Sequence, residues 1–83
     1  MNIVTIAGKS SFIKSEALSK LAGQHPILTG SALESMIPAL KSKAIALAPD
    51  TFVDDASGAL LTKLQALSKS YPAHYTLFVC LQA

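Results

Sequence analysis

The segment Gly8-Lys9-Ser10-Ser11 is the first whose residue types and spacing could bind an anion. It follows a short apolar run and precedes a helical pattern, an arrangement in which free amides at a helix N-terminus face a phosphate or carboxylate. With Lys9 as the phosphate lysine, the full phosphate-loop pattern requires a glycine at position 3, where the chain has isoleucine. The loop is also too short to wrap a triphosphate, which favours an ordinary turn with a serine N-cap. Weak binding of a phosphate or carboxylate stays open.

Three carboxylates, Asp50, Asp54 and Asp55, lie close together ahead of another helical pattern. Clustered carboxylate oxygens suit a hard divalent cation. The segment lacks the glycine-containing spacing of a calcium loop, and Asp54 or Asp55 is well placed to cap the helix that follows. We therefore expect capping and solvation here and no metal site.

Cys80, the only cysteine, is a candidate nucleophile. His74 is on the same face of the same predicted strand, but at ~3.3 Å per residue the two lie ~20 Å apart, far beyond hydrogen-bond reach. Nothing in the sequence brings His25 to Cys80. Cys80 is therefore predicted to be a small buried hydrophobe. Because no catalytic set, zinc spacing or cofactor motif stands out, we expect neither an enzyme nor a bound cofactor.

Length and composition predict one domain over residues 1–83. Charged residues make up 14% of the chain against roughly 25% in typical soluble domains, which indicates either a face buried against another protein or a second copy, or a surface of small neutral residues. The net charge of +2 comes from scattered lysines without arginine or a basic stripe, which disfavours nucleic-acid binding. No apolar run suits a membrane span, the start is a poor signal peptide, and a single cysteine excludes an internal disulfide. We therefore expect a cytoplasmic protein.

The first quarter of the chain predicts a strand followed by a helix. Residues 3–7 are rich in β-branched side chains and are apolar at both odd and even positions. This pattern predicts a strand buried on both faces. A helix is predicted next: Ser10 or Ser11 offers its N-cap, and Gly23 ends it. The apolar residues at helical spacing are Ile13, Ala17, Leu18, Leu21 and Ala22. Residues 24–30 contain turn-forming pairs and are predicted to be a connector.

A second helix is predicted over residues 31–40. Ser31 and Glu34 have the spacing of a capping box, whereas Pro38 predicts a kink or an early end. The apolar run Ala44–Ala48 has two interpretations: the continuation of one long kinked helix, or a buried strand closed by the proline that follows. We favour the strand, because two lysines interrupt the helical pattern and the run has strand length.

The last part predicts a loop over residues 49–55, a helix from about Asp55 to Ser70, and the strongest strand over residues 74–81, apolar on both faces. Strands separated by helices pair in parallel through right-handed crossovers. The predicted fold is thus α/β, a small three-stranded, mostly parallel sheet with about three helices in the order β-α-α-β-α-β.

The segment from Gly30 to Leu40 resembles part of a known family. Its glycine, leucine and acidic Glu34, followed by a helix, are similar to the second helix of the barstar-type ribonuclease inhibitors, small intracellular α/β proteins with a short parallel sheet and a similar succession of elements. Ala32 stands in place of that family's asparagine and Ile37 in place of its tryptophan. The family's inhibitory face is acidic, whereas this chain is net basic. The resemblance implies a non-catalytic binding role, with Gly30 and Glu34 in the binding region, and no particular nuclease target.

Two functions from different classes follow. The first is a small protein-binding module, such as an inhibitor or an accessory subunit, that binds another chain or a copy of itself. The alternative is a small-molecule or anion-binding domain that uses the loops at the carboxyl ends of the strands, where open α/β sheets usually bind ligands. In that alternative, residues 8–11 and 50–55 face each other across the sheet.

Overall fold

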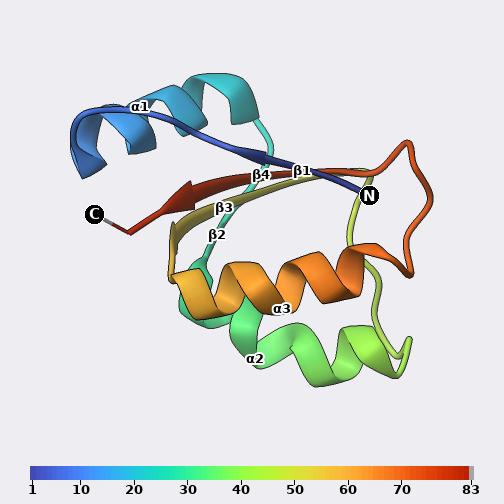
Figure 1. Ribbon diagram of the computed structural model, residues 1–83. Helices are drawn as coiled ribbons and strands as arrows, with labels where there is room; N and C mark the ends of the chain where they lie inside the picture. Colours follow the sequence, from blue (N-terminus) through green and yellow to red (C-terminus); the bar gives the residue numbers. More distant parts are fainter. Residues whose placement is uncertain (83) are drawn as a thin grey trace.

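A parallel four-stranded sheet organises the chain (Figure 1). The computed structural model describes residues 1–82 and their side chains, except that of Ser11. Its elements are β1 (Asn2–Thr5), α1 (Ser11–Ala22), β2 (Ile27–Thr29), α2 (Gly30–Lys41), β3 (Asp50–Ala56), α3 (Gly58–Ser68) and β4 (Thr76–Leu81). The strands pair in parallel in the order β1-β4-β3-β2. The predicted α/β class with parallel pairing is confirmed, but the sheet has four strands instead of three.

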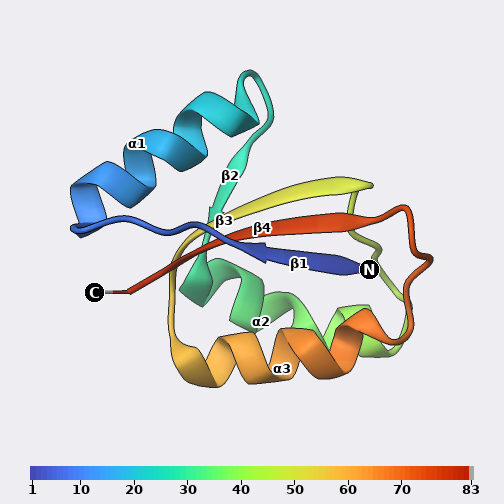
Figure 2. The same ribbon diagram turned by 45° about the horizontal axis from the view of Figure 1, so that its top comes forward.

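The helices are divided between the two faces of the sheet. Helices α2 and α3 cover one face and α1 lies on the other (Figure 1 and Figure 2). The connections from β2 to β3 and from β3 to β4 advance across the sheet in one direction, whereas the connection from β1 to β2 crosses in the opposite direction. Right-handed crossovers therefore place α1 on the face opposite α2 and α3.

Two apolar clusters hold these layers together. The larger cluster, on the α2 and α3 side, contains the buried residues Leu33, Ile37, Leu40, Leu47, Val53, Ala56, Leu60, Leu64, Leu67, Leu77 and Val79. The smaller cluster, on the α1 side, contains Leu18, Ala22, Phe52 and Cys80. Strand β4 supplies residues to both clusters because successive side chains of a strand point to opposite faces. The predicted burial of this strand on both faces is confirmed.

Strand β1 is an edge strand and less buried than its sequence predicts. Within residues 1–82 it pairs with β4 alone, and Val4 lies opposite Phe78. Ile3 packs against the larger cluster, but Val4 is 40% exposed. The expectation of burial on both faces is wrong. An edge strand can carry apolar side chains at both odd and even positions although one of its faces is incompletely covered.

The predicted strand Ala44–Ala48 is also wrong, since this run is part of the loop between α2 and β3. Helix α2 ends at Lys41, so the alternative of one long helix fails as well. Leu47 is buried in the larger cluster, and its amide donates to the Tyr71 hydroxyl at 3.2 Å. Core contacts and this hydrogen bond explain why an apolar run of strand length forms a loop.

Strand β3 occupies the segment predicted to be a carboxylate-bearing loop. Its buried residues are Thr51, Phe52, Val53 and Ala56. Asp50 begins the strand, and Asp54 and Asp55 lie at a register shift near its end. The strand is central in the sheet, and its middle residues are buried. Its charged residues lie at the two ends. For this reason the local sequence pattern of the strand resembles that of a loop.

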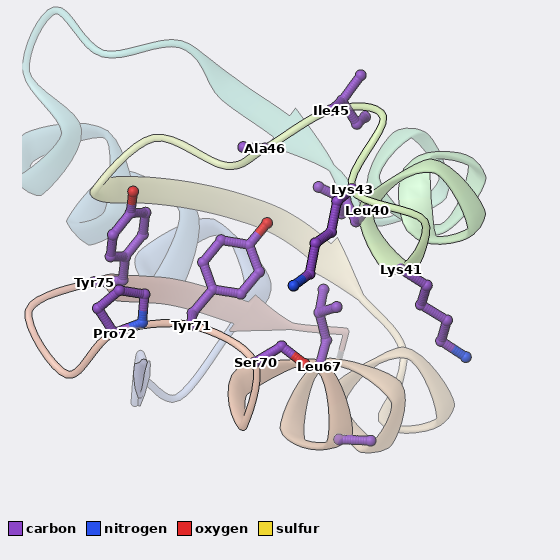
Figure 3. Close-up of a pocket in the computed structure, with 11 residues that line it drawn as sticks. Leu40, Lys41, Lys43, Ile45, Ala46, Leu67, Ser70, Tyr71, Pro72 and Tyr75 are labelled. Atoms are coloured by element: carbon purple, nitrogen blue, oxygen red, sulfur yellow. The ribbon is translucent and has the colours of Figure 1, made fainter.

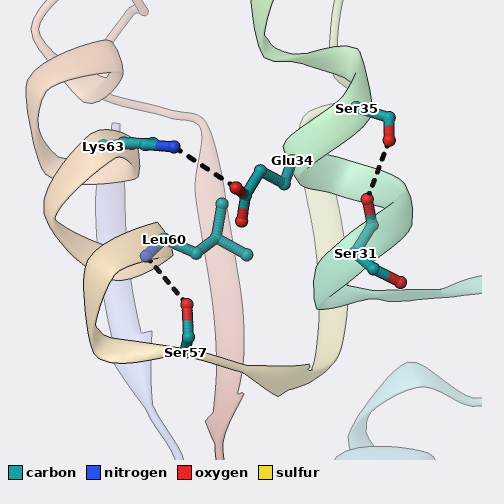
Figure 4. Close-up of polar contacts among 6 residues, drawn as sticks. All are labelled: Ser31, Glu34, Ser35, Ser57, Leu60 and Lys63. Atoms are coloured by element: carbon teal, nitrogen blue, oxygen red, sulfur yellow. Dashed lines mark hydrogen bonds and ion pairs between the residues drawn. The ribbon is translucent and has the colours of Figure 1, made fainter.

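Helix α3 begins later than predicted. Ser57 is its N-cap, and the Ser57 hydroxyl accepts a hydrogen bond from the Leu60 amide at 3.1 Å (Figure 4). The predicted capping by Asp54 or Asp55 is wrong, because both residues belong to β3.

Helix α2 follows directly on β2, a strand of three residues in the segment predicted to be a connector. The Thr29 hydroxyl accepts from the Ala32 amide at 3.2 Å, so Thr29 is the N-cap and the predicted capping box of Ser31 and Glu34 does not form. The helix continues past Pro38, which lies on its exposed side.

Candidate functional site

The carboxyl edge of the sheet contains a topological switch point between β1 and its neighbour β4. The chain leaves β1 toward α1 on one face, whereas β2 and β3 are followed by helices on the other face. In open α/β sheets, ligands bind in the crevice outside the carboxyl ends of the strands at such a point. The loop after β1, the end of β4 and the end of β3 therefore frame the candidate site.

The loop after β1 carries Gly8, Lys9 and Ser10. The Ser10 hydroxyl accepts from the Ile13 amide at 3.2 Å, which confirms the predicted turn with a serine N-cap. Lys9 is exposed. Ser11 is the first residue of α1, and its side chain lies outside the described part of the chain.

Gly8 is closely approached by Lys14 from the second turn of α1. A Cβ atom on Gly8 would lie 2.8 Å from Lys14 Cγ, so any larger residue would displace that side chain. The Lys14 ammonium donates to the carbonyl of Leu81, the last residue of β4, at 3.1 Å. Lys14 therefore places a half-buried positive charge over the end of β4, next to the β1 loop.

Asp54 is the acceptor at the centre of the site. The Ser15 hydroxyl lies 3.1 Å from both oxygens of the Asp54 carboxylate, and the Asp55 amide donates to one of them at 2.8 Å. Burial raises the pKa of the adjacent Cys80 thiol, and a hydrogen bond to Asp54 and the charge of Asp54 raise it further. Ser15 and Asp54 thus form a half-buried hydroxyl–carboxylate pair that joins α1 to β3.

Lys14 and Ser15 are the functional candidates that the sequence analysis missed. A phosphate-loop pattern consists of a glycine, four variable residues, a second glycine, a lysine and a serine or threonine. With Gly8 as its first glycine, this pattern places Lys14 and Ser15 at the required positions, and Ile13 replaces the second glycine. When Gly8 is instead taken as the second glycine and Lys9 as the lysine, the alignment of Lys14 and Ser15 with the pattern is hidden.

Asp50 and Asp55 do not join Asp54 in a carboxylate cluster. Asp50 begins β3, at the opposite edge of the sheet from the switch point. Asp55 is exposed and has a left-handed backbone with φ of 56°. Among residues 1–82, no group of three or more His, Cys, Asp and Glu side chains could hold a metal ion. The expectation that residues 8–11 face the whole segment 50–55 is therefore wrong for Asp50.

Gly30 and Glu34, the residues singled out by the family resemblance, have structural contacts. A Cβ atom on Gly30 would lie 2.9 Å from Ala56 Cα and even closer to the Asp55 carbonyl oxygen, so glycine permits α2 to begin directly against β3. Glu34 forms an ion pair with Lys63 of α3 at 3.3 Å (Figure 4). Both partners are about half exposed, and such surface pairs contribute about 0.2–1 kcal/mol.

Comparison of the chain with protein-family models, with curated proteins and with solved structures found no match. Within the part of the chain that the structure describes, no helix is both long and apolar enough to cross a membrane.

Proposed function

We propose that this chain binds a phosphate-bearing small molecule at the carboxyl edge of its sheet. The observation that carries the proposal is the double contact of Ser15 with Asp54, formed by a serine that has phosphate-loop spacing from Gly8. In phosphate-loop proteins, the lysine contacts the phosphates, while the serine and an aspartate from a neighbouring strand hold the magnesium ion. Lys14, Ser15 and Asp54 supply this donor set.

The donor set suits a cation that arrives with its ligand. Magnesium keeps several waters and is commonly bound by one or two protein groups plus substrate phosphates. One carboxylate and one hydroxyl meet that requirement, although they do not form a complete protein cage. To bind phosphate, the Lys14 ammonium must give up its hydrogen bond to the Leu81 carbonyl and donate to a phosphate oxygen instead. This exchange is favourable because a hydrogen bond to a charged acceptor is stronger than one to a neutral carbonyl.

Ile13, in place of the second glycine of the phosphate-loop pattern, restricts the proposed function to phosphate binding without catalysis. In the phosphate-loop pattern a glycine lets the backbone wrap around the phosphate chain, whereas here α1 already begins at Ser11 and Ile13 lies within its first turn. The turn is too tight to enclose a triphosphate. The expected ligand has one or two accessible phosphates, and we propose no catalytic step.

The test is titration of the protein with pyrophosphate, with and without magnesium, followed by amide shifts in NMR spectra. Saturable shifts at residues 8–15 and 54, stronger with magnesium, are expected. Lys14→Ala and Ser15→Ala should each weaken binding about tenfold, a typical effect of losing a hydrogen bond to a charged group.

Two residues on the same helix provide matched controls. Lys20→Ala and Ser19→Ala remove the same groups from exposed positions of α1 and should leave the affinity unchanged. Absence of saturable binding, or equal losses in the Lys14 and Lys20 variants, would refute the proposed site.

A second function, binding of another protein chain or of a copy of this one, is favoured by the apolar side chains left on α1 and β1. Phe12 is 76% exposed, and Ile13 and Leu21 are about half exposed. Ile13 and Leu21 share one side of α1 because they are eight residues apart. Val4 lies on the same face of the sheet as this helix, since its partner Phe78 packs against the α1 cluster. Exposed apolar groups on adjoining elements are typical of protein-binding surfaces.

A further inference from the structure

A cavity of about 430 Å³ lies at the amino edge of the sheet, the edge opposite Lys14 and Asp54. It lies between the C-terminal ends of α2 and α3, below the loop that connects α2 to β3 (Figure 3). Its volume falls in the range of small-molecule sites. The phosphate site uses none of its residues.

The walls of this cavity are mainly apolar and aromatic. Leu40 and Leu67 come from the two helices, and Ile45 comes from the loop. The rings of Tyr71 and Tyr75 form another wall, with centroids 5.2 Å apart and planes at 57°. Such walls accommodate a short aliphatic or aromatic group.

Among residues 1–82, the charged residues that line the cavity are Lys41 and Lys43, and no carboxylate lines it. The Lys43 side chain extends over Leu67 toward Tyr71, whereas Lys41 points away from the cavity (Figure 3). The cavity therefore combines an apolar interior with one cation near its mouth.

Lys43 holds this position through an unusual backbone conformation. Its φ is 64°, a left-handed value at which glycine is the usual residue. The Lys43 amide donates to the Leu40 carbonyl at 3.2 Å and the Ala44 amide to the Ala39 carbonyl at 3.0 Å. These two bonds form the Schellman motif that ends α2, in which the residue at the Lys43 position is most often glycine. A lysine here is thus less favourable for stability than glycine, and it adds an ammonium at the cavity.

The Tyr71 hydroxyl provides a second polar group. It accepts a hydrogen bond from the Leu47 amide at 3.2 Å. Among the hydrogen bonds of residues 1–82, its own hydrogen has no acceptor. That hydrogen is therefore available to a ligand oxygen in the cavity, which Tyr71 and Lys43 both line.

We propose that this cavity binds a small amphipathic carboxylate, such as a medium-chain fatty acid. The aliphatic chain packs against Leu40, Leu67 and the tyrosine rings. The carboxylate accepts from the Lys43 ammonium and the Tyr71 hydroxyl. This function is separate from phosphate binding and does not depend on it.

The experiment compares octanoate with octanol by calorimetry and by NMR amide shifts. For ligands of this size we expect a dissociation constant for octanoate of about 10 μM to 1 mM. Octanol, which has the same tail without the charge, should bind about five- to tenfold more weakly. The shifts should fall at residues 40–46 and 67–75.

Lys43→Gly is the decisive variant because it removes the ammonium and introduces the residue that the backbone favours. It should raise the Tm and, at the same time, reduce the affinity for octanoate to that for octanol. Lys20→Ala, which removes one positive charge from the other face of the sheet, is the control and should bind octanoate as the parent does.

Four results would each overturn the proposal: no saturable octanoate binding, equal affinities of the parent chain for octanoate and octanol, equal losses in the Lys43→Gly and Lys20→Ala variants, or octanoate-dependent shifts confined to residues 8–15. Because pyrophosphate and octanoate are titrated separately, failure of either site leaves the other testable.

Discussion

The contact between Gly30 and β3 predicts a large loss of stability on adding a single methyl group. In Gly30→Ala the new Cβ would lie 2.9 Å from Ala56 Cα, whereas carbon atoms pack best at about 3.5–4.0 Å. The Asp55 carbonyl oxygen is closer still. Both obstacles are backbone atoms of a central strand, so rotation of a side chain cannot relieve them. Overpacking of this kind costs about 1–3 kcal/mol.

Gly58→Ala is a matched control because Gly58 is also the first residue of a helix that follows a hydroxyl N-cap. A Cβ atom on Gly58 meets nothing within 4 Å, so the substitution should stabilise the fold by about 0.4–1 kcal/mol through a less flexible unfolded chain. The same gain partly offsets the overpacking in Gly30→Ala. The two variants should therefore differ by about 1–3 kcal/mol.

Urea unfolding followed by circular dichroism measures both variants. The midpoints should move in opposite directions with little change in the slope of free energy against urea, since the exposed surface is similar. In thermal unfolding, a 1 kcal/mol change corresponds to about 4–8 °C for a domain of this size. Equal stability of the two variants would refute the inferred contact between α2 and β3.

Four further predictions concern the core, the thiol, for which there are two, and the exposed apolar side chains. Leu64→Ala should cost about 2–5 kcal/mol in urea unfolding, because Leu64 is fully buried; a loss below 1 kcal/mol would contradict that burial. Native Cys80 should react with a maleimide much more slowly than in the unfolded chain, and equal rates would contradict its burial. Because its pKa is raised in the folded state, only the unfolded chain loses the thiol proton just above pH ~8.5, so stability should fall there, and Cys80→Ala should lack this fall. If β1 and α1 form an interface between copies, light scattering should show a dimer that Val4→Lys converts to a monomer, whereas a monomeric parent would remove self-association from the second proposed function.

The elements that could be predicted from sequence are those whose local pattern agrees with their place in the fold. Helix α1 has helical spacing up to Gly23, and β4 has apolar side chains on both parities, as a central strand requires. Strand β2 could not be found in this way, because its three residues follow His25 and Pro26 and have no periodicity of their own. It becomes a strand by pairing with β3.

The run Ala44–Ala48 is the reverse case, since its sequence predicts a strand that does not form. Its apolar composition comes from one side chain in the core and others around a cavity, and neither position requires a strand. An apolar composition indicates that a segment contacts apolar surroundings. Whether the segment forms a strand depends on whether another strand lies beside it to accept its backbone hydrogen bonds.

The candidate site was predicted in part. Gly8 and Ser10 were correctly placed at the carboxyl edge, because a turn that opens a helix leaves a signal in the sequence. Asp54 was expected there as part of a loop after the strand Ala44–Ala48, which does not form, and the structure places it near the end of β3 instead. Lys14 and Ser15 were missed because they fit the helical pattern of α1 and their roles depend on contacts with β4 and β3. Those contacts join residues far apart in the chain, which spacing alone does not reveal.

The pairing of β1 with β4 alone has a consequence for the order of assembly. During synthesis, β3 follows its partner β2 in the chain, and β4 follows its partner β3. These strand pairs can therefore form one after the other through short loop closures. β1 and α1 are made first, yet β1 has no partner until β4 has left the ribosome. Until then Leu18 and Ala22 lack Phe78 and Cys80, the part of their cluster that β4 supplies, which prolongs the interval in which the nascent chain is prone to aggregation. Any chain that stops before Thr76 leaves β1 unpaired.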